Sequence, residues 1–329
     1  MKKRILVVYT GGTIGMVMTD AGYAPDSGFE RKMRDAQNDW PEVGAALDWS
    51  WLAIEPPIDS ADMTQRHWLE MRDRIVAALA QEAHDGVVVL HGTDTLAYTA
   101  SALAFLLRGL PAPVVLTGAM RPAGQPDTDA WGNLFGSMLA HREALSPGVH
   151  VYFHGRLLPG ARVTKLHSDL DDAFHVLRPE SLPLQPLRQQ IPFDYRTRVQ
   201  EVKLAVAPLY PGLRAEVLRA LLSGGVQGAV LECYGTGTGP AGDAALMDVL
   251  RQAAAHGVVI VGISQCPAGR MAPGQYAAGS LLRQAGVLPS GGMTREAALG
   301  KLFCLLGAGV SAADMAFWWE CNLCGEHGQ

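Results

Sequence analysis

Short apolar runs that end at glycine recur along this chain and alternate with helical patterns. Ile5–Tyr9 leads into Gly11-Gly12-Thr13, and Val87–Leu90 leads into His91-Gly92-Thr93. A run of β-branched residues bounded by glycine is typical of a strand that is buried on both faces of a sheet. The two runs therefore predict two buried strands, each followed by a glycine turn that carries a threonine.

The rest of the chain continues the same alternation. Thr64 is a plausible N-cap for the first long helix, because the apolar residues behind it recur at helical spacing. Further predicted helices and strands cover residues 64–80, 97–107, 133–142, 215–222, 243–256 and 294–306 (helices), and 114–116, 149–153, 204–207, 228–231 and 258–263 (strands). Repeated strand–helix units imply parallel sheets covered by helices, so the predicted fold class is α/β.

A proline-rich stretch interrupts this pattern. Prolines stand at 179, 183, 186 and 192 with little periodicity around them, which indicates a linker. We therefore expect two α/β domains with mostly parallel sheets, over residues 1–190 and 203–329, joined by a linker over 191–202. The chain shows no internal repeat of the kind that solenoids have.

Two other segments lack periodicity. Gly22–Gly28 has the composition of a loop, and its glycines would let it move. Cys321 and Cys324 have CxxC spacing near the C-terminal end, but a structural zinc site usually needs four ligands. We expect this tail to be frayed rather than metal-bound.

Composition and charge narrow the class of protein. The chain has 329 residues, 48% of them hydrophobic and 18% charged, with a net charge of −5 and five cysteines. These values fit a globular protein with a full core and no disulfide scaffold. No lysine–arginine run suggests a nucleic-acid partner, and no apolar stretch is long enough to span a membrane. The apolar run behind Met1–Arg4 is too short for a signal peptide, so we expect a cytoplasmic location.

The two glycine–threonine segments are the first candidates for chemistry. Thr13 and Thr93 would stand at the carboxyl ends of strands, where open α/β sheets bind ligands. Thr13 also fits an ordinary helix cap, and so does Asp94. The first segment matches neither the dinucleotide-binding glycine pattern nor a phosphate-binding loop with its lysine.

Three further side chains are candidates with ordinary alternatives. Lys165 is a surface charge unless it is buried beside a hydroxyl, where it can lose its proton and act as a base. Tyr23, in the expected loop, and Ser60, in a turn, both have plain structural explanations.

Taken together, these segments resemble the bacterial-type L-asparaginase (asparaginase–glutaminase) family almost from end to end. The matching segments are Thr10–Gly15, Asp59-Ser60, His91–Thr95, Thr117–Pro122, Asp129 with Asn133-Leu134, Thr164-Lys165, Tyr234–Gly237, Ser264–Cys266, Gly274–Gly279 and Ala285–Val287. Thr164–Asp169 with Asp172–Phe174 is more similar to the cytosolic type I branch of the family, although Gly118–Pro122 is more similar to the sequences of the periplasmic branch.

The resemblance implies hydrolysis of the side-chain amide of L-asparagine to L-aspartate and ammonia through a threonine acyl-enzyme. It implies Thr13 as the nucleophile, with Tyr23 on a loop that closes over the substrate. The sequence leaves open which of the two threonines attacks first, and we favour Thr13 because a mobile cover can shield it from water. Thr93, Asp94 and Lys165 would form a second triad, in which Lys165 is the base. The N–H of Thr93 is the candidate oxyanion donor.

The resemblance also implies where the substrate binds. Asp94 would pair with the substrate ammonium and Ser60 with its carboxylate, and charge-assisted bonds of this kind hold an amino acid firmly. The implied substrate-binding residues are Asp59, Ser60, Thr93, Asp94 and Ala119. No metal or organic cofactor is implied.

Other readings stay open at the level of sequence. One methylene separates asparagine from glutamine, so a glutaminase–asparaginase of dual specificity remains an alternative. A non-catalytic nucleotide- or ligand-binding α/β protein is a second, since fold alone does not give function. Some cytosolic family members are regulated by their substrate, which makes Thr164 and Cys266 candidates for an allosteric site. The family also implies self-association as a homodimer or homotetramer.

Overall fold

A six-stranded sheet organises the N-terminal half of the protein. The computed structural model describes residues 2–20, 22–26, 28–177, 193–272 and 277–327. The sheet has the order β4-β1-β5-β6-β7-β8, and neighbouring strands are parallel except for β7 and β8. Its strands are β1 Lys3–Gly11, β4 Leu47–Ile58, β5 Gly86–Leu90, β6 Pro113–Thr117, β7 Gly148–Phe153 and β8 Arg156–Pro159.

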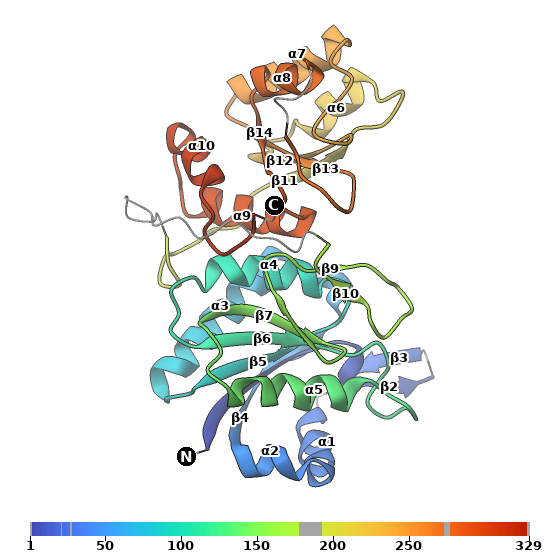
Figure 1. Ribbon diagram of the computed structural model, residues 1–329, viewed down its shortest axis with the longest axis vertical. Coiled ribbons are helices and arrows are strands. Elements are labelled where there is room, and N and C mark those ends of the chain that lie inside the picture. The colour runs from blue at the N-terminus through green and yellow to red at the C-terminus, as the bar shows by residue number, and fades with distance from the viewer. Residues whose placement is uncertain (1, 21, 27, 178–192, 273–276, 328–329) are drawn as a thin grey trace. The chain divides into compact units, whose positions relative to one another are not determined.

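Helices cover both faces of this sheet (Figure 1). Helices α3 and α4 pack together on one face, and α2 and α5 pack together on the other. The helices of this half are α1 Phe29–Ala36, α2 Pro41–Ala46, α3 Gln65–Gln81, α4 Leu96–Leu106 and α5 Ala130–Leu139. Strands β1 and β5 are buried along almost their whole length, as expected for strands sandwiched between two helix layers.

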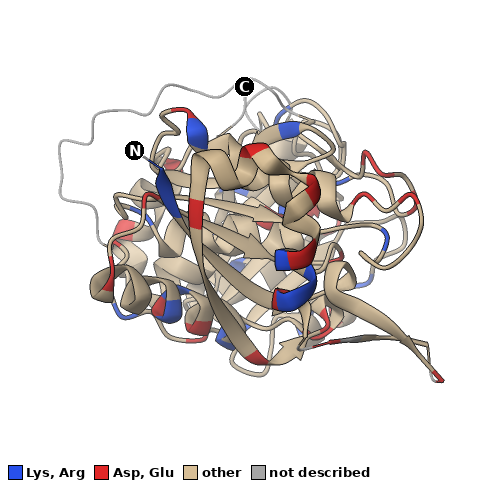
Figure 2. Ribbon diagram, turned by 90° about the horizontal axis from the view of Figure 1, so that it is seen from below, with Lys and Arg blue, Asp and Glu red and all other residues tan. Residues whose placement is uncertain are grey.

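Charged residues of both signs are interspersed along the ribbon when the molecule is seen from below (Figure 2). Helix α1 illustrates the pattern, because Arg34 pairs with Glu30 one turn away at 2.6 Å, while Phe29 and Met33 point into the core. This amphipathic spacing places one face of the helix in the core and the other in solvent. Among the described residues, no helix combines the length and the apolar character needed to cross a membrane.

Two antiparallel hairpins extend the N-terminal half. The segment predicted as a loop forms strand β3 Gly22–Pro25, which pairs with β2 Met16–Thr19. The prediction of an irregular loop was therefore wrong for these residues, because alternating turn-forming residues can also pair across a tight turn. The second hairpin pairs β9 Thr164–Lys165 with β10 Phe174–His175.

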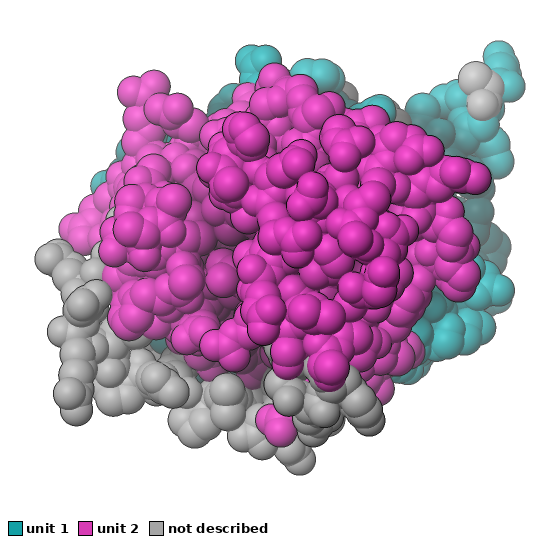
Figure 3. Space-filling model, turned by 90° about the horizontal axis from the view of Figure 1, so that it is seen from above, with its two compact units in different colours: residues 1–176 teal, residues 177–329 magenta. Residues whose placement is uncertain are grey.

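Contacts divide the chain into two compact units, Met1–Val176 and Leu177–Gln329, which Figure 3 colours separately. The second unit has its own sheet of four parallel strands in the order β11-β12-β13-β14. Its elements are β11 Leu204–Pro208, α6 Ala215–Leu221, β12 Gly228–Cys233, α7 Ala244–Ala255, β13 Val259–Ser264, α8 Ala277–Gln284, β14 Val287–Pro289, α9 Arg295–Gly307 and α10 Ala312–Glu320. The predicted α/β class with two mostly parallel sheets is confirmed.

The predicted linker, 191–202, is described by the structure from residue 193 onward. Most of the proline-rich stretch lies within 178–192, which the structure does not describe, and residues 193–202 contain neither helix nor strand. The domain bounds at 190 and 203 stay a prediction.

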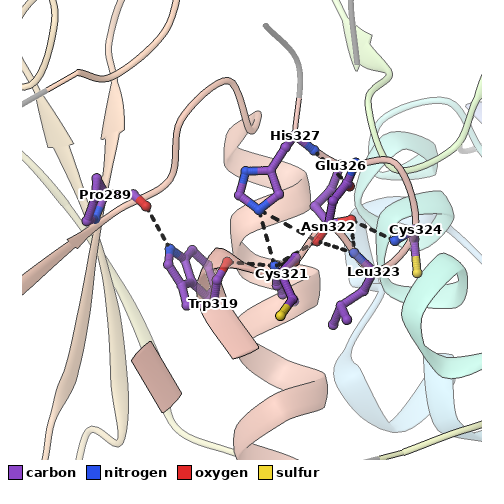
Figure 4. A network of polar contacts seen from close by, with 9 residues as sticks. Pro289, Trp319, Cys321, Asn322, Leu323, Cys324, Glu326 and His327 are labelled. Atoms are coloured by element: carbon purple, nitrogen blue, oxygen red, sulfur yellow. Dashed lines mark hydrogen bonds and ion pairs between the residues drawn. The ribbon is translucent and has the colours of Figure 1, made fainter. Parts of the chain in front are cut away.

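The C-terminal tail packs into the second unit instead of fraying (Figure 4). Lys301, fully buried on α9, donates hydrogen bonds to the backbone oxygens of Trp319 and Cys321 at 2.7 and 2.6 Å, and to Glu326 at 2.7 Å. Glu326 in turn accepts from the backbone N–H groups of Leu323 and Cys324, at 3.1 and 2.7 Å. The prediction of a frayed tail was wrong because a buried ammonium offers three donors that this tail satisfies.

Candidate active site

Strands β1 and β5 are neighbours at the topological switch point of the sheet, where the strand order reverses. The chain leaves β1 for β4 on one side, whereas it leaves β5 for β6 on the other. Open α/β sheets bind ligands outside the carboxyl ends of such a strand pair. Thr13 follows β1 and Thr93 follows β5, so topology alone places both threonines at this edge.

Glycines let three strand ends approach each other closely here. Gly12 has a φ of 85°, and a Cβ on it would lie 2.3 Å from the backbone nitrogen of Gly92. A Cβ on Gly92 would lie 2.4 Å from the Oγ of Ser60, which follows β4. Contacts this short are open only to glycine, so these turns require it. The structure thus brings together the Thr13 turn, the Thr93 turn and Ser60.

Lys165 reaches Thr93 and Asp94 from the short hairpin β9–β10. Its Nζ donates to the Oγ1 of Thr93 at 3.0 Å and to the Oδ1 of Asp94 at 2.8 Å. Thr93 is buried and the side chain of Lys165 is 18% exposed, whereas that of Asp94 is 66% exposed. The alternative of Lys165 as a solvated surface charge is thereby excluded. An amine held on a hydroxyl oxygen can take the proton of that hydroxyl once the amine itself is deprotonated.

His91 is a buried neutral group beside these turns, and sequence reasoning assigned no role to it. Burial lowers the pKa of His91 to about 4. Its Nδ1 donates to the carbonyl oxygen of Gly92 at 2.7 Å, and its backbone N–H donates to Thr117 at 2.9 Å. His91 therefore ties the end of β5 to the end of β6 without carrying a charge.

Tyr23 lies on strand β3, beside a small cavity. A cavity of about 180 Å³ is lined by the β2–β3 hairpin, the turn after Thr13 and residues 122–125. The hydroxyl of Tyr23 accepts a hydrogen bond of 2.5 Å from the Nε2 of Gln125. In the described part of the chain no hydrogen bond joins Tyr23 to Thr13. The structure thus places Tyr23 at the rim of this cavity, held by a residue that sequence reasoning did not single out.

The remaining predicted site residues fall into three groups. Ala119 is fully buried behind β6, within the same core cluster as Ile14. Asp59 accepts a hydrogen bond of 3.0 Å from the backbone of Ala61 and so caps the turn that carries Ser60. Thr164 pairs with His175 in the β9–β10 hairpin, whereas Cys266 is exposed behind β13 in the second unit. An allosteric site involving Thr164 and Cys266 stays a prediction.

The first unit has the donors and charges that an amino-acid substrate needs. A hydroxyl–lysine pair, an exposed carboxylate and a buried serine lie around one strand edge. Within the described residues, no group of three or more His, Cys, Asp or Glu side chains is arranged to hold a metal ion.

Comparison with known proteins accounts for the whole chain. Residues 4–197 match the family model "Asparaginase, N-terminal", and residues 203–318 match "Glutaminase/Asparaginase C-terminal domain". L-asparaginase 1 of Escherichia coli K12 is 34% identical over 340 residues, covering 99% of this chain and 98% of the relative.

Solved structures agree with this assignment. The crystal structure of L-asparaginase I from Vibrio cholerae has a TM-score of 0.83 at 32% identity and covers 100% of both chains. A probable cytoplasmic L-asparaginase from Campylobacter jejuni has a TM-score of 0.78 at 25% identity, covering 97% of this chain and 100% of that one. With both family models matched in order and a full-length relative above 30% identity, the chain belongs to the asparaginase family.

Proposed function

We propose that this protein is an L-asparaginase, which hydrolyses the side-chain amide of L-asparagine to L-aspartate and ammonia. The observation that carries the proposal is the Lys165–Thr93–Asp94 group, which stands at the switch point beside the Thr13 turn. An amide is a poor electrophile and water a poor nucleophile, so a covalent ester intermediate divides one high barrier into two lower ones.

In the first step, Thr13 attacks the amide carbon and ammonia leaves, which forms an acyl-enzyme on its Oγ1. Tyr23 orients or activates this hydroxyl from the β2–β3 hairpin. The hairpin is held at its base, since the buried hydroxyl of Tyr9 donates to the backbone oxygen of Asp26 at 2.9 Å. A nucleophile beneath such a cover is shielded from water while the ester exists.

In the second step, water cleaves the ester and releases aspartate. Lys165 acts as the base through the hydroxyl of Thr93, while Asp94 holds the Nζ of Lys165 in place at 2.8 Å. The tetrahedral intermediate carries an oxyanion, for which the backbone N–H of Thr93 is the donor. Loss of one such donor typically costs about 2.7–4 kcal/mol in the transition state.

The substrate's charged ends are bound by the same turns. Asp94, with its exposed carboxylate, takes the α-ammonium, and the hydroxyl of buried Ser60 takes the α-carboxylate. Thr95 supports Ser60, because its Oγ1 donates to the backbone oxygen of Ser60 at 2.7 Å. Asp59 fixes the turn, and the backbone of Ala119 completes the pocket.

Ammonia release by single variants tests the proposal. Thr13→Ala and Thr93→Val remove one hydroxyl each, and Lys165→Met removes the amine while keeping its bulk. Thr99→Val is a matched control, since this buried hydroxyl bonds to Trp68 on α3. We expect near-complete loss in the first three and normal rates in the control. Normal rates in Lys165→Met would remove it from the mechanism.

The preference between amides is tested in the same assay. An apolar pocket distinguishes one methylene by only about 1–3 kcal/mol. We expect asparagine to be the better substrate, and equal kcat/KM values for asparagine and glutamine would instead identify an enzyme of dual specificity.

Self-association and location extend the proposal. We expect a homodimer or homotetramer in the cytoplasm, in keeping with the solved relative described as a probable cytoplasmic L-asparaginase. Exposed apolar side chains such as Val217 and Leu221 on α6 offer surface for such contacts. Light scattering on the purified protein gives the assembly state directly.

A further inference from the structure

Segment 118–129, called here the β6–α5 loop, joins three parts of the site. Its start lies behind β6 at the buried Ala119. Its middle reaches the nucleophile turn, where the N–H of Ala123 donates to the backbone oxygen of Ile14 at 3.2 Å, and also the hairpin, where Gln125 holds Tyr23. The conformation of this loop therefore affects both the Thr13 turn and the β2–β3 hairpin that carries Tyr23.

The carboxylate of Asp129 fixes the start of the loop. Its Oδ2 accepts from the backbone N–H of Met120 and its Oδ1 from that of Arg121, both at 2.9 Å. Asp129 stands at the N-cap position of α5, yet its side chain makes no cap hydrogen bond to that helix. Thr128 serves the helix instead, because its Oγ1 accepts from the N–H of Ala130 at 3.1 Å. Aspartate at this position ordinarily caps its own helix, whereas the side chain of Asp129 binds the backbone of the loop instead.

Asn133, one helical turn later, extends this support. Its Nδ2 donates to the Oδ2 of Asp129 and to the backbone oxygen of Gly118, both at 3.0 Å. Its Oδ1 accepts from the backbone N–H of His154 at 2.9 Å, in the turn between β7 and β8. Asn133 is buried, so each of these bonds forms away from water.

Backbone hydrogen bonds at the start of the loop involve the residues on both sides of Ala119. The carbonyls of Thr117 and Gly118 and the N–H groups of Met120 and Arg121 all have partners. Among the described residues, neither the N–H nor the C=O of the fully buried Ala119 has one. Buried backbone groups are almost always paired, so a pair left over at a candidate site points to a ligand.

We infer that Asp129 and Asn133 are positioning residues that hold the backbone of Ala119 against the substrate's amide end and thereby set the preference for asparagine over glutamine. The inference rests on the proposed L-asparaginase function. A side-chain amide has both N–H donors and a C=O acceptor, which the C=O and the N–H of Ala119 complement. One extra methylene shifts this end of the substrate, and a fixed peptide cannot follow it.

Kinetics of graded variants test the inference. Asp129→Asn keeps one acceptor oxygen, and Asp129→Ala keeps none. We expect kcat/KM for asparagine to fall about 10-fold and about 100-fold, respectively, because small misplacements of bound groups have effects of this size. The ratio of kcat/KM for asparagine to that for glutamine should fall toward one in both variants.

A matched carboxylate elsewhere separates positioning from stability. Asp243 caps α7 in the second unit, where its Oδ1 accepts from the N–H of Leu246 at 3.0 Å. Asp243→Asn should lower the melting temperature while leaving kcat/KM and the substrate ratio within about twofold. If the Asp129 variants lose stability but keep both kinetic values, the inference is overturned.

Binding without turnover provides a readout besides activity. In a Thr13→Ala background, Asp129→Asn should weaken asparagine binding about 10-fold by calorimetry, and it remains measurable where Asp129→Ala does not fold. Unchanged binding in this double variant overturns the inference. Failure of the proposed function is distinguishable, because the wild-type protein would then release no ammonia from asparagine.

Discussion

At the scale of single residues, the site combines largely covered polar groups with one exposed carboxylate. Lys165 is largely covered and contacts a hydroxyl, while its partner Asp94 extends into solvent. His91 lies between the turns as a neutral imidazole with one donor used on Gly92. Of these three side chains, the proposed chemistry uses the charges of Lys165 and Asp94, whereas His91 adds none.

The neutral state of His91 predicts a pH dependence of stability. Its pKa is about 4 in the folded protein and about 6.5 in the unfolded chain, so only the unfolded chain binds the proton in between. The stability that a neutral His91 contributes is complete above pH 6.5 and is lost as the pH falls toward 4. At pH 4.5 the loss approaches roughly 2–3 kcal/mol for this residue.

Chemical denaturation at pH 7 and pH 4.5 measures this effect. His91→Gln has no group that titrates, so its free energy of unfolding should fall less than that of the wild type, by roughly 2–3 kcal/mol. Identical losses in the two proteins would show that His91 is not the titrating group.

The sequence was enough to name the candidate site residues, but not to predict their burial and contacts. Thr13, Ser60, Thr93 and Lys165 were singled out by pattern and resemblance, and the structure brings Lys165 onto Thr93. Lys165 lies on the β9–β10 hairpin, 72 positions along the chain from Thr93. Contacts over such separations are set by packing, which local patterns do not encode.

At the scale of elements, the glycine turns after β1 and β5 fix the geometry of the site. Gly12→Ala would introduce a Cβ 2.3 Å from the Gly92 nitrogen at a φ of 85°. Overpacking and backbone strain together should destabilise the protein by about 2–5 kcal/mol. Activity should fall further than stability, because the clash separates the two threonine turns.

Helix α5 provides the control for this substitution. A Cβ on Gly132 would meet nothing within 4 Å, so Gly132→Ala should stabilise the protein by about 0.5–1 kcal/mol through helix propensity. Thermal unfolding and ammonia release report on both variants. A Gly12→Ala protein with wild-type stability and activity would contradict the close-approach account.

Elements with one strong period were predicted well, and those with mixed signals were not. Helix α3 begins behind Thr64 and covers 65–81, close to the predicted 64–80, because cap and periodicity agree. Strand β4, Leu47–Ile58, was not predicted, since it mixes tryptophans with two prolines and lies at the sheet edge. Prolines are tolerated on edge strands, so this sequence gives no clear strand signal.

At the scale of the whole molecule, each unit has its own core, and the tail belongs to that of the second. Burial alone would raise the pKa of Glu326, but the charge of Lys301 and the hydrogen bonds that Glu326 accepts hold this pKa below its ordinary value. The buried ion pair therefore persists at neutral pH. No local pattern marks Lys301 as buried, which is why the sequence suggested a frayed tail.

Breaking this ion pair tests its role. Lys301→Met leaves the carboxylate of Glu326 buried without its partner and should cost about 3–5 kcal/mol of stability. Adding Glu326→Gln should cost less than the sum of the two single changes, since neither charge then remains.

The control for the ion pair is an exposed lysine of the same unit. The Nζ of Lys203 donates to the backbone oxygen of Gly224 at 3.3 Å, and Lys203→Met should change stability by no more than about 0.5 kcal/mol. Hydrogen exchange of α9 reports the effect within the second unit. Equal stability of the Lys301→Met and Lys203→Met variants would show that the buried pair does not hold the tail.

The most direct test of the account is ammonia release from L-asparagine by the wild type, Thr13→Ala and Thr93→Val. We predict one ammonia and one aspartate per asparagine from the wild type. Each variant should lose about 10³-fold or more in kcat while keeping its melting transition, as expected when a member of a catalytic unit is removed. Wild-type rates in either folded variant would contradict the two-threonine mechanism.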